Sequence, residues 1–595
     1  MKMTVLDASS VAALLREFGQ RSALRGGNPF RAKAYARAAD NLLALSLPLA
    51  TIIAQDRLRQ IPGVGDAIAD IIKKLFATGT HPALEKMRAE TPAGVLDMLT
   101  VPGLRPDKVV KLYRELGIAS LEELEEAARE GRVQKVKGLG AALQTKVLHG
   151  LAMRRESHGK RHMHRAAELL KSAETHLIEA TPDIVRVTPA GDFRRGCELI
   201  GPLSLVAEVS KLQGPPKTIR AGGQLAVHLT DAAHYGITLC LATGSEAHLV
   251  GLRDIAAKRN MTLEECGLCR GGKVIAAKSE EAIYMALGMQ PVPPELREGR
   301  DEIARAIAGT LPELVTDANI KGILHAHTDR SDGLDTLETM ADATRARGYE
   351  YFGVADHSKS AHYAGGLSVD AVAEQQVEAE RLNKKYGRAF RIFKGIESDI
   401  LADGALDYPD GVLESFDFVV ASVHGRFKLD RATQTQRIIR AVADPYTTIL
   451  GHMTGRQLLR RPGYEIDIEK VLTACAEHGV AVEINANPWR LDLDWRWHET
   501  ALRLGCLMSV NPDAHSTREI DLTHWGVEMA RKGGVPRERV LNCLSRDEFA
   551  EYLEGRRARC KGKTASSRRR VLATGSGFRP PRRGSSRSLR KRAAR

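Results

Sequence analysis

The sequence has few of the features that mark secreted and membrane proteins. Its eight cysteines are scattered among 595 residues. Scattered thiols in a long chain are typical of a reduced compartment, so we expect a cytoplasmic protein without a disulfide scaffold. The longest apolar stretch, residues 42–53, is short and contains Pro48, so it cannot form a membrane-spanning helix. We recognise no signal peptide in the sequence.

One cysteine pair has the spacing of a metal-binding motif. Cys266 and Cys269 form a Cys-x-x-Cys motif. A zinc site would need a second such pair nearby, and the sequence has none. We therefore interpret the pair as two ordinary thiols.

Acidic residues are absent after Glu554. Residues 555–595 contain sixteen Lys and Arg, so removing them from the total of 88 leaves 72 basic residues against 74 acidic ones. The body is therefore near neutral, and the net charge of +14 belongs to the tail. The composition of residues 556–595 is typical of a disordered segment. Its basic runs predict a salt-sensitive arm for nucleic acid, the alternative being a solubilising tail.

A short pattern occurs three times in the N-terminal third. An apolar residue, a glycine-bearing turn and an amphipathic helix follow one another at residues 61–72, 101–110 and 136–147. Glycine permits backbone shapes closed to other residues, and the free N–H groups at the helix start can hold a phosphate. The pattern predicts helix-hairpin-helix motifs that bind the DNA backbone without reading bases. The glycines assigned to this contact are Gly63, Gly65, Gly103, Gly138 and Gly140.

The second repeat departs from the pattern because Arg105 occupies the place of the second glycine. The alternative is a plain helical bundle with glycine caps. Three repeats so close together favour hairpins. We expect a first hairpin domain over residues 1–82 and a second, fingers-like one over residues 83–160.

Between residues 320 and 530, β-rich runs alternate with helical stretches. The predicted strands are near 322–324, 351–355, 391–396, 416–423, 447–451, 480–485 and 507–510. The predicted helices are near 336–347, 369–385, 431–442, 468–478 and 498–504. Seven strands that alternate with helices predict a distorted (β/α)7 barrel.

Histidines and carboxylates stand at the ends of these predicted strands. The C-terminal strand ends of a barrel meet at one rim, so these side chains should converge. They are His325, His327, Asp332, His357, Glu397, His424, His452, Asp513 and His515. A single such residue is more often a cap or a surface group, but nine at successive strand ends predict two or three divalent ions. Imidazole and carboxylate ligands without thiolate suit manganese, with zinc or iron as alternatives.

Such a site predicts phosphoester hydrolysis. Three divalent ions bring six positive charges against three carboxylates, and the remainder invites a hydroxide and a phosphate. One ion can acidify a bound water to make the nucleophile, while others neutralise phosphate oxygens.

The middle third contains four short motifs, which are residues 191–198 (GDFRRGCE), residues 201–205 (GPLSL), Thr243-Gly244-Ser245 with His248, and residues 293–298 (PPELRE). In order and spacing they resemble the palm of family X DNA polymerases. The nine C-terminal residues are similar to the ligand set of the PHP family, named for polymerases and histidinol phosphatases. Over about residues 1–555 the chain thus resembles bacterial family X polymerases with a C-terminal PHP domain. This implies a nucleotidyltransferase-like palm and thumb over residues 161–315 and a PHP phosphoesterase domain over residues 316–555.

The palm departs from the family where nucleotidyl transfer needs metal-binding carboxylates. Pro202, Ser204 and Ala226 stand in their places, and Asp192 replaces a small hydroxyl residue that contacts the nucleotide. We therefore expect an inactive polymerase centre whose fold acts as a DNA clamp. Arg194 and Arg195 are assigned to DNA contact. The position of the lyase lysine of animal relatives falls on Ile71, and we predict no lyase activity.

The PHP resemblance implies a distribution of the ligands. One metal would have His325, His327, Glu397 and Asp513; a second Asp332, His357 and His515; and a third Glu397, His424 and His452. Arg490 is a candidate phosphate contact, the alternative being an ion pair with Asp492 or Asp494. Asp356 is a candidate for orienting a ligand.

Taken together, the sequence predicts a monomeric, metal-dependent DNA phosphodiesterase without membrane association. The resemblance favours a 3′→5′ exonuclease that trims or repairs 3′ ends. The alternatives are an active gap-filling polymerase with an editing domain, a DNA-end adaptor, and a small-molecule phosphatase.

Overall fold

The computed structural model describes residues 6, 8–26, 29–43, 49–61, 63–101, 104–157, 159–212, 215–221 and 225–558. The chain forms two compact units. The first comprises residues 1–161 with the segment 457–462, and the second comprises residues 162–456 and 463–595. The predicted basic tail lies outside the described residues from position 559 onward, and so does Gly103.

The first unit is built from helices around two cores. The helices are α1 (Ala8–Leu24), α2 (Pro29–Leu43), α3 (Leu49–Ala54), α4 (Asp66–Thr78), α5 (Pro82–Glu90), α6 (Ala93–Met98), α7 (Pro106–Leu116), α8 (Leu121–Arg129), α9 (Arg132–Lys135) and α10 (Gly140–Ser157). Leu15, Ile72 and Leu84 belong to the core of α1 to α5. Leu112 and Leu124 belong to the core of α6 to α10. The predicted helical hairpin domains are thereby confirmed as helical.

Each of the three predicted turns contains the same type of backbone hydrogen bond. The amides of Val64, Leu104 and Leu139 each donate to the carbonyl three residues earlier, at 3.0 Å in every case. These three side chains and those of their acceptors are buried. The common bond folds the chain tightly before each helix, so the repeat in sequence is a repeat in structure.

The place of Arg105 does not require glycine. Gly65 precedes α4 with φ −90°, and Arg105 precedes α7 with φ −85°. Residues of any type adopt such angles, so the second turn keeps its shape without the glycine. Gly63 and Gly138 are different, because both have φ 82°, which favours glycine.

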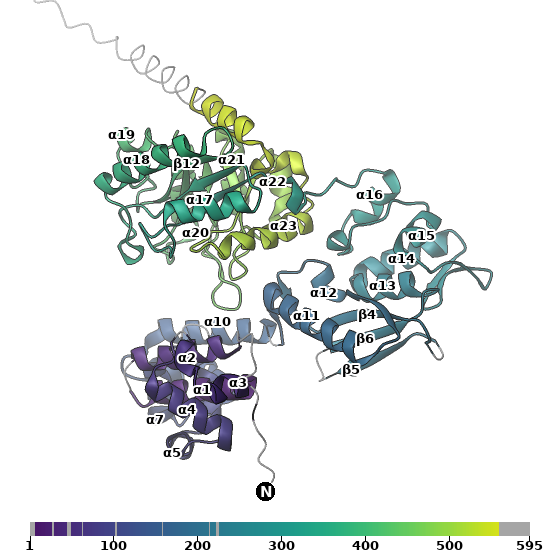
Figure 1. Ribbon diagram of the computed structural model, residues 1–595, viewed down its shortest axis with the longest axis horizontal. Coiled ribbons are helices and arrows are strands. Elements are labelled where there is room, and N and C mark those ends of the chain that lie inside the picture. Colours follow the sequence, from purple (N-terminus) through teal and green to yellow (C-terminus); the bar gives the residue numbers. More distant parts are fainter. Residues whose placement is uncertain are drawn as a thin grey trace, which may run out of the picture. The chain divides into compact units, whose positions relative to one another are not determined.

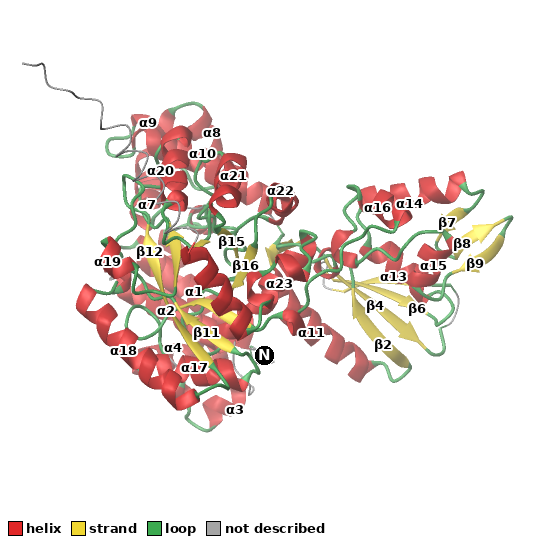
Figure 2. Ribbon diagram, turned by 90° about the horizontal axis from the view of Figure 1, so that it is seen from above, coloured by secondary structure: helices red, strands yellow, loops and turns green. Residues whose placement is uncertain are grey.

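The palm of the second unit is a mixed four-stranded sheet. Its order is β2 (Ile184–Pro189), β4 (Leu203–Val209), β6 (Leu225–Thr230) and β5 (Lys217–Ala221). All seven residues of β4 are buried. Helices α11 (Met163–Ala180) and α13 (Tyr235–Thr243) pack against β4 (Figure 2). The short strands β1 (Arg161–His162) and β3 (Leu199–Ile200) pair with each other, and α12 (Gly191–Arg194) lies between β2 and β3 in the chain.

The thumb follows the palm and has its own core. It contains α14 (Glu246–Lys258), the antiparallel sheet β7 (Thr262–Glu264), β8 (Gly267–Arg270) and β9 (Lys273–Ala276), and the helices α15 (Glu280–Ala286) and α16 (Glu302–Ala308). Leu252, Leu268 and Ile283 lie in this core together with Ile237 of α13. In the β7–β8 turn the Cys266 and Cys269 sulfurs lie 3.4 Å apart, and both are free thiols.

A seven-stranded parallel barrel forms the rest of the second unit. The strands, paired in chain order, are β10 (Gly322–Ala326), β11 (Tyr351–Val354), β12 (Arg391–Asp399), β13 (Phe418–Ser422), β14 (Ile449–Leu450), β15 (Ala481–Asn485) and β16 (Met508–Asn511). The helices are α17 (Leu337–Ala346), α18 (Val369–Tyr386), α19 (Asp410–Leu413), α20 (Arg431–Ala443), α21 (Ile468–His478), α22 (His498–Leu504) and α23 (Thr523–Lys532). Figure 1 shows α17, α18 and α21 around β12.

The barrel closes through a single bridge. Ala326, at the end of β10, pairs with Ala514 beyond the end of β16, and the His327 amide donates to the Ala514 carbonyl at 2.8 Å. The predicted (β/α)7 fold is confirmed. Sequence analysis missed the short α19 and the helix α23. No helix in the described part of the chain is both long and apolar enough to cross a membrane.

We predict that Gly63→Ala loosens the first hairpin turn and that Gly65→Ala does not. Alanine at position 63 is forced into the left-handed region, which costs about 1 kcal/mol, whereas position 65 has an ordinary φ and no atom within 4 Å of an added Cβ. Hydrogen exchange of residues 61–75 in the full chain should be about fivefold faster in the first variant only. Equal exchange in both variants would contradict this account of the turn.

Candidate metal centre

The nine predicted ligand residues lie at the C-terminal ends of six barrel strands. β10 and the segment after it bring His325, His327 and Asp332, and β12 brings Glu397. The segments after β11, β13, β14 and β16 bring the others, which are His357, His424, His452, Asp513 and His515. All nine belong to four overlapping groups, and within each group the ligand atoms lie within 4.8 Å of one another. The barrel therefore gathers on one rim residues that are up to 190 positions apart in sequence.

Glu397 lies at the centre of this cluster. Its Oε1 lies 2.9 Å from His452 Nε2, 3.2 Å from His325 Nε2 and 3.2 Å from His424 Nε2. Its Oε2 lies 2.9 Å from His357 Nδ1. The carboxylate is 1% exposed, so a single buried acid is shared by histidines from four strands.

Asp332 is the corresponding carboxylate toward the solvent. Its Oδ1 lies 3.4 Å from His515 Nε2 and 3.5 Å from His357 Nε2. The ring of His327 stacks on the rings of His357 and His515 at centroid distances of 4.5 and 4.2 Å. These four side chains form one potential ligand group.

The other groups share residues with one another, and the division of the ligands that the family resemblance implies stays a prediction. His325, His327 and Asp513 lie together as expected. His452 groups with Glu397 and His325, whereas His424 groups with Glu397 and His357. His424 Nε2 and His452 Nε2 nevertheless both face Oε1 of Glu397, at 3.2 and 2.9 Å, and their rings are 5.2 Å apart.

Two of the nine residues have left-handed backbones. His325 has φ 57° and Asp513 has φ 52°. Residues other than glycine rarely adopt such angles, and the surrounding structure must enforce them. Both residues adjoin the bridge between Ala326 and Ala514 that closes the barrel. The closure of the barrel therefore also sets the direction of two ligand side chains.

The charges of the cluster are strongly coupled. Burial lowers the pKa of His327 to about 3. Burial also acts to lower the pKa of His357, but Glu397 and Asp332 raise it to about 10. The pKa of Glu397 is held well below its ordinary value, against the effect of burial, by His424, His325 and His357. Ionised carboxylates thus face imidazoles, and the protonated imidazoles can bind a metal ion once they release their protons.

The donor atoms fit a group of metal ions. In the described structure, several buried ligand atoms make no hydrogen bond, although they lie close to their neighbours. Those that face another ligand are Nε2 of His325, Nδ1 of His327 and His357, and Oε2 of Glu397. Buried polar atoms are normally paired, and each exception needs an explanation, which metal coordination provides.

Two further carboxylates orient the histidines. Glu483 on β15 accepts a hydrogen bond from His325 Nδ1 at 2.5 Å and from the His452 amide at 2.7 Å. Asp399 accepts from His424 Nδ1 at 2.5 Å. Sequence analysis missed both residues, although each stands at or near a strand end. Such partners fix the tautomer and direction of a ligating imidazole.

Asp356 holds the chain between two ligands. Its carboxylate is fully buried and accepts from the Thr328 amide at 2.7 Å, the Thr328 hydroxyl at 2.7 Å and the Ser331 hydroxyl at 2.5 Å. Thr328 and Ser331 lie between the ligand positions 327 and 332. Asp356 therefore shapes the ligand-bearing loop rather than joining the cluster, in line with the orienting role that was considered for it.

Arg490 and Tyr363 stand beside the cluster. Arg490 Nε lies 3.6 Å from Asp513 Oδ2, and the side chain is 20% exposed. Asp494 pairs instead with Arg456 and Arg496. The Tyr363 side chain is 70% exposed, and its ring lies 6.1 Å from that of His357. Tyr363 is a second candidate substrate contact, which no sequence motif indicated.

Three family models and a full-length relative match this chain. The family model of the DNA polymerase beta thumb matches residues 238–298, a helix-hairpin-helix domain model matches residues 7–81, and a SAM-like helix-hairpin-helix tandem model matches residues 95–148. The "DNA polymerase/3′-5′ exonuclease PolX" of Bacillus subtilis is 32% identical, over 92% of this chain and 100% of that protein. The chain belongs to the PolX family. The family X resemblance read from the sequence is confirmed.

A second set of relatives matches about two fifths of the chain. A "probable phosphatase" of Caldanaerobacter subterraneus is 28% identical over 40% of this chain and 92% of that protein. A "probable phosphatase" of Vibrio campbellii is 27% identical over 39% of this chain and 91% of that protein. These proteins match only about two fifths of this PolX chain, whereas the Bacillus relative matches nearly all of it.

The palm of this PolX chain does not fit a metal pair. Ser204 on β4 lies directly opposite Ala226 on β6, and Pro202 immediately precedes β4. The Ser204 hydroxyl is 3.1 Å from His228 Nε2, and His228 Nδ1 is 2.8 Å from the Thr218 hydroxyl. Among the described residues, every group of three or more potential ligands lies in the barrel. Of the three positions that the sequence comparison matched with the family's carboxylates, one thus has a hydroxyl group and none has an acid.

The two arginines assigned to DNA contact form internal ion pairs. Arg194 Nη2 lies 2.6 Å from Glu280, and Arg195 Nε lies 2.9 Å from Glu298. Arg195 also pairs with Asp192 at 2.7 Å. These contacts join palm to thumb and explain both arginines structurally, so their role in DNA binding stays a prediction.

We predict that Glu483→Gln weakens metal binding about 10- to 100-fold. The amide cannot accept the charge-assisted hydrogen bond of His325 as well as the carboxylate does, so the imidazole is less firmly oriented. Titration with Mn²⁺ followed by equilibrium dialysis measures the affinity. The control is Glu469→Gln on α21, whose exposed ion pair with Arg503 involves none of the nine candidate ligands. Unchanged affinity in Glu483→Gln would contradict the orienting role.

Proposed function

We propose that this PolX protein is a metal-dependent DNA phosphodiesterase that shortens or processes 3′ ends, with the nine-residue cluster as its active site. The observation that carries the proposal is the convergence of six histidines and three carboxylates, with unpaired buried ligand atoms, at one barrel rim. The PolX relative is named a polymerase and 3′-5′ exonuclease, and the barrel relatives are named phosphatases. The reaction common to the barrel relatives and the exonuclease is cleavage of a phosphoester.

The arrangement of ligands supports two or three divalent ions, proposed to be Mn²⁺ with Zn²⁺ or Fe²⁺ as alternatives. When bound, such ions acidify a water and neutralise phosphate oxygens. Arg490 is proposed to hold a phosphate oxygen beside the cluster, since its partly exposed guanidinium lies 3.6 Å from the candidate ligand Asp513. Glu483 and Asp399 keep His325 and His424 directed into the site.

The N-terminal unit supports DNA as the substrate. The three equivalent turns precede helices α4, α7 and α10, where backbone N–H groups can hold phosphates. Helix-hairpin-helix models match residues 7–81 and 95–148. We propose backbone contact there without base reading, with the glycines of the turns as the contact points.

We propose that the polymerase centre is inactive and that the palm and thumb serve as a clamp. Nucleotidyl transfer needs carboxylates that hold two metals, and Ser204 and Ala226 face each other where those carboxylates belong. An active gap-filling polymerase is the alternative suggested by the relative's name. The cytoplasmic location and the monomeric state stay predictions.

A small-molecule phosphatase is the second candidate function. The observation that favours it is the match of the barrel alone to proteins named phosphatases. The hairpin unit speaks against it, because a monoester substrate needs no DNA-binding turns. A DNA-end adaptor without catalysis is less consistent with ligands for more than one ion.

We predict stepwise shortening of DNA that depends on the barrel. With Mn²⁺ and an end-labelled, 3′-recessed duplex, wild type should shorten the labelled strand, and His325→Ala should lose the activity at least about a hundredfold. The assay is run with and without deoxynucleotides, and no extension is expected. Extension with nucleotides would refute the inactive palm, and hydrolysis of phosphate monoesters without DNA shortening would favour the phosphatase.

We predict that Arg490→Ala lowers the turnover of DNA about 100-fold with unchanged metal content. The loss arises because the phosphate is held less well, while no proposed ligand is removed. Arg490→Lys should restore part of the turnover, since it keeps the charge without the fork geometry. Arg503→Ala, at an exposed ion pair on α22, is the matched control. Wild-type turnover in Arg490→Ala would exclude the phosphate contact.

A further inference from the structure

The segment that carries Arg490 is a loop between strand β15 and helix α22. We call residues 486–497 the β15–α22 loop. Its middle is buried, since Leu491, Asp492 and Leu493 are 0% exposed. Its end contains the short helix Trp495–Trp497. The position of the Arg490 side chain depends on how this loop is held.

The barrel holds the inner side of the loop. The Leu493 amide donates to the Glu483 carbonyl at 3.1 Å, and the Asn485 amide donates to the Asp492 carbonyl at 2.6 Å. Arg456 donates from Nε to the Arg490 carbonyl at 3.0 Å and also to the Leu491 carbonyl. Arg456 therefore fixes the backbone of Arg490 directly.

The palm holds the outer side of the same loop through Glu198. Glu198 Oε2 accepts from Trp495 Nε1 at 2.8 Å, and Oε1 accepts from Arg496 Nη1 at 2.7 Å. Burial opposes ionisation of Glu198, but Arg496 and Arg456 hold its pKa below the ordinary value. A buried carboxylate of the palm thus stays charged because the barrel supplies two arginines.

The contacts continue from Glu198 to Arg490. Arg496 Nη1 also donates to Asp494 at 2.9 Å, and Asp494 accepts from Arg456 Nη1 at 2.6 Å. Arg456 in turn binds the carbonyl of Arg490. Each link is a charge-assisted hydrogen bond, the stronger and more directional class. The chain of contacts leads from the palm to the mouth of the metal centre.

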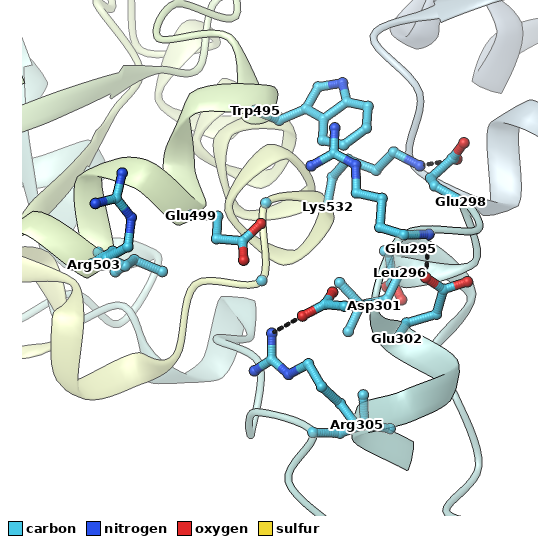
Figure 3. Close-up of a pocket in the computed structure, with 15 residues that line it drawn as sticks. Glu295, Leu296, Glu298, Asp301, Glu302, Arg305, Trp495, Glu499, Arg503 and Lys532 are labelled. Atoms are coloured by element: carbon cyan, nitrogen blue, oxygen red, sulfur yellow. Dashed lines mark hydrogen bonds and ion pairs between the residues drawn. The ribbon is translucent and has the colours of Figure 1, made fainter. Parts of the chain in front are cut away.

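The palm, the thumb and the barrel all contact the side chain of Trp495. The thumb guanidinium of Arg300 lies 4.4 Å from the ring centroid, and the barrel ammonium of Lys532 lies 4.8 Å from it. Lys532 also pairs with Glu298 of the thumb, as Figure 3 shows. At the other end of the loop, Trp489 packs on His162 of β1 at 4.2 Å. The loop is therefore supported by palm and thumb along its length.

We infer that Glu198 is a positioning residue for the barrel's active site, acting on Arg490 through the β15–α22 loop. The inference rests on the proposed nuclease function of that site. It gives the palm a task that does not require its lost carboxylates. The palm is a structural part of the hydrolytic site, in addition to any contact with DNA.

A matched pair of variants separates an effect on the position of Arg490 from a general loosening of the second unit. Glu198→Gln weakens the contact that reaches the loop. Glu295→Gln weakens a buried contact of the thumb with the barrel, to Arg531 Nε at 2.7 Å on α23. Among the described residues, neither side chain of this pair hydrogen-bonds to residues 486–497. Both variants keep side-chain volume, and thermal unfolding and metal content confirm that each is folded and loaded.

The first readout is hydrogen exchange of residues 486–497 in the full, Mn²⁺-loaded chain. We expect several-fold faster exchange in Glu198→Gln and wild-type exchange in Glu295→Gln. Unchanged exchange in Glu198→Gln, or the same change in both variants, overturns the inference. This readout needs no enzymatic activity, so it decides the inference even if wild type fails to cut DNA and the proposed function falls.

The second readout is a double-mutant cycle on DNA shortening. Glu198→Gln should lower kcat between about 10- and 100-fold, as expected for a misplaced phosphate contact. In an Arg490→Ala background it should cause no further loss, because the residue through which it acts is already gone. Losses that multiply in the double variant mean that Glu198 does not act through Arg490, and they overturn the inference.

Discussion

The structure depends on one buried carboxylate that is shared by many histidines. Glu397 sits at the end of β12, 1% exposed, within 3.2 Å of ring nitrogens from four other chain segments. Such a concentration of ligands is stable only with compensating positive charge, from protons or from metal ions. The closure of the barrel, the left-handed backbones of His325 and Asp513, and the orienting carboxylates all serve to hold this arrangement.

The palm also contributes to the support of the barrel's candidate site. Ser204 and Ala226 are not metal-binding residues, and among the described residues the palm sheet contains no group of three potential ligands, yet all of β4 is buried in the sheet. Contacts through Glu198 and Trp495 tie the palm to the loop beside the metal centre. Under the proposed function, the palm is therefore retained as a support for the active site of the barrel.

Much of the barrel could be predicted from the sequence because strands and helices alternate regularly along it. All seven strands and five of the seven α-helices of the barrel were predicted, and the convergence of the nine candidate ligands follows from the rule that strand ends meet at one rim. The carboxylates that orient the histidines, Glu483 and Asp399, could not be predicted, since their roles depend on the directions of side chains. Nor could the partners of Arg194 and Arg195, because ion pairs over long sequence distances leave no local pattern. Arg105 was judged a defect, but the φ of that position tolerates any residue.

The most direct test of this account is to count the metal ions. Purified protein is loaded with Mn²⁺, freed of excess and measured by inductively coupled plasma mass spectrometry, beside Glu397→Gln. The account predicts two to three ions per chain in wild type. Because Glu397 is shared, the single substitution should remove more than one of them. At most one ion in wild type, or a loss of no more than one in Glu397→Gln, would contradict a shared multinuclear centre.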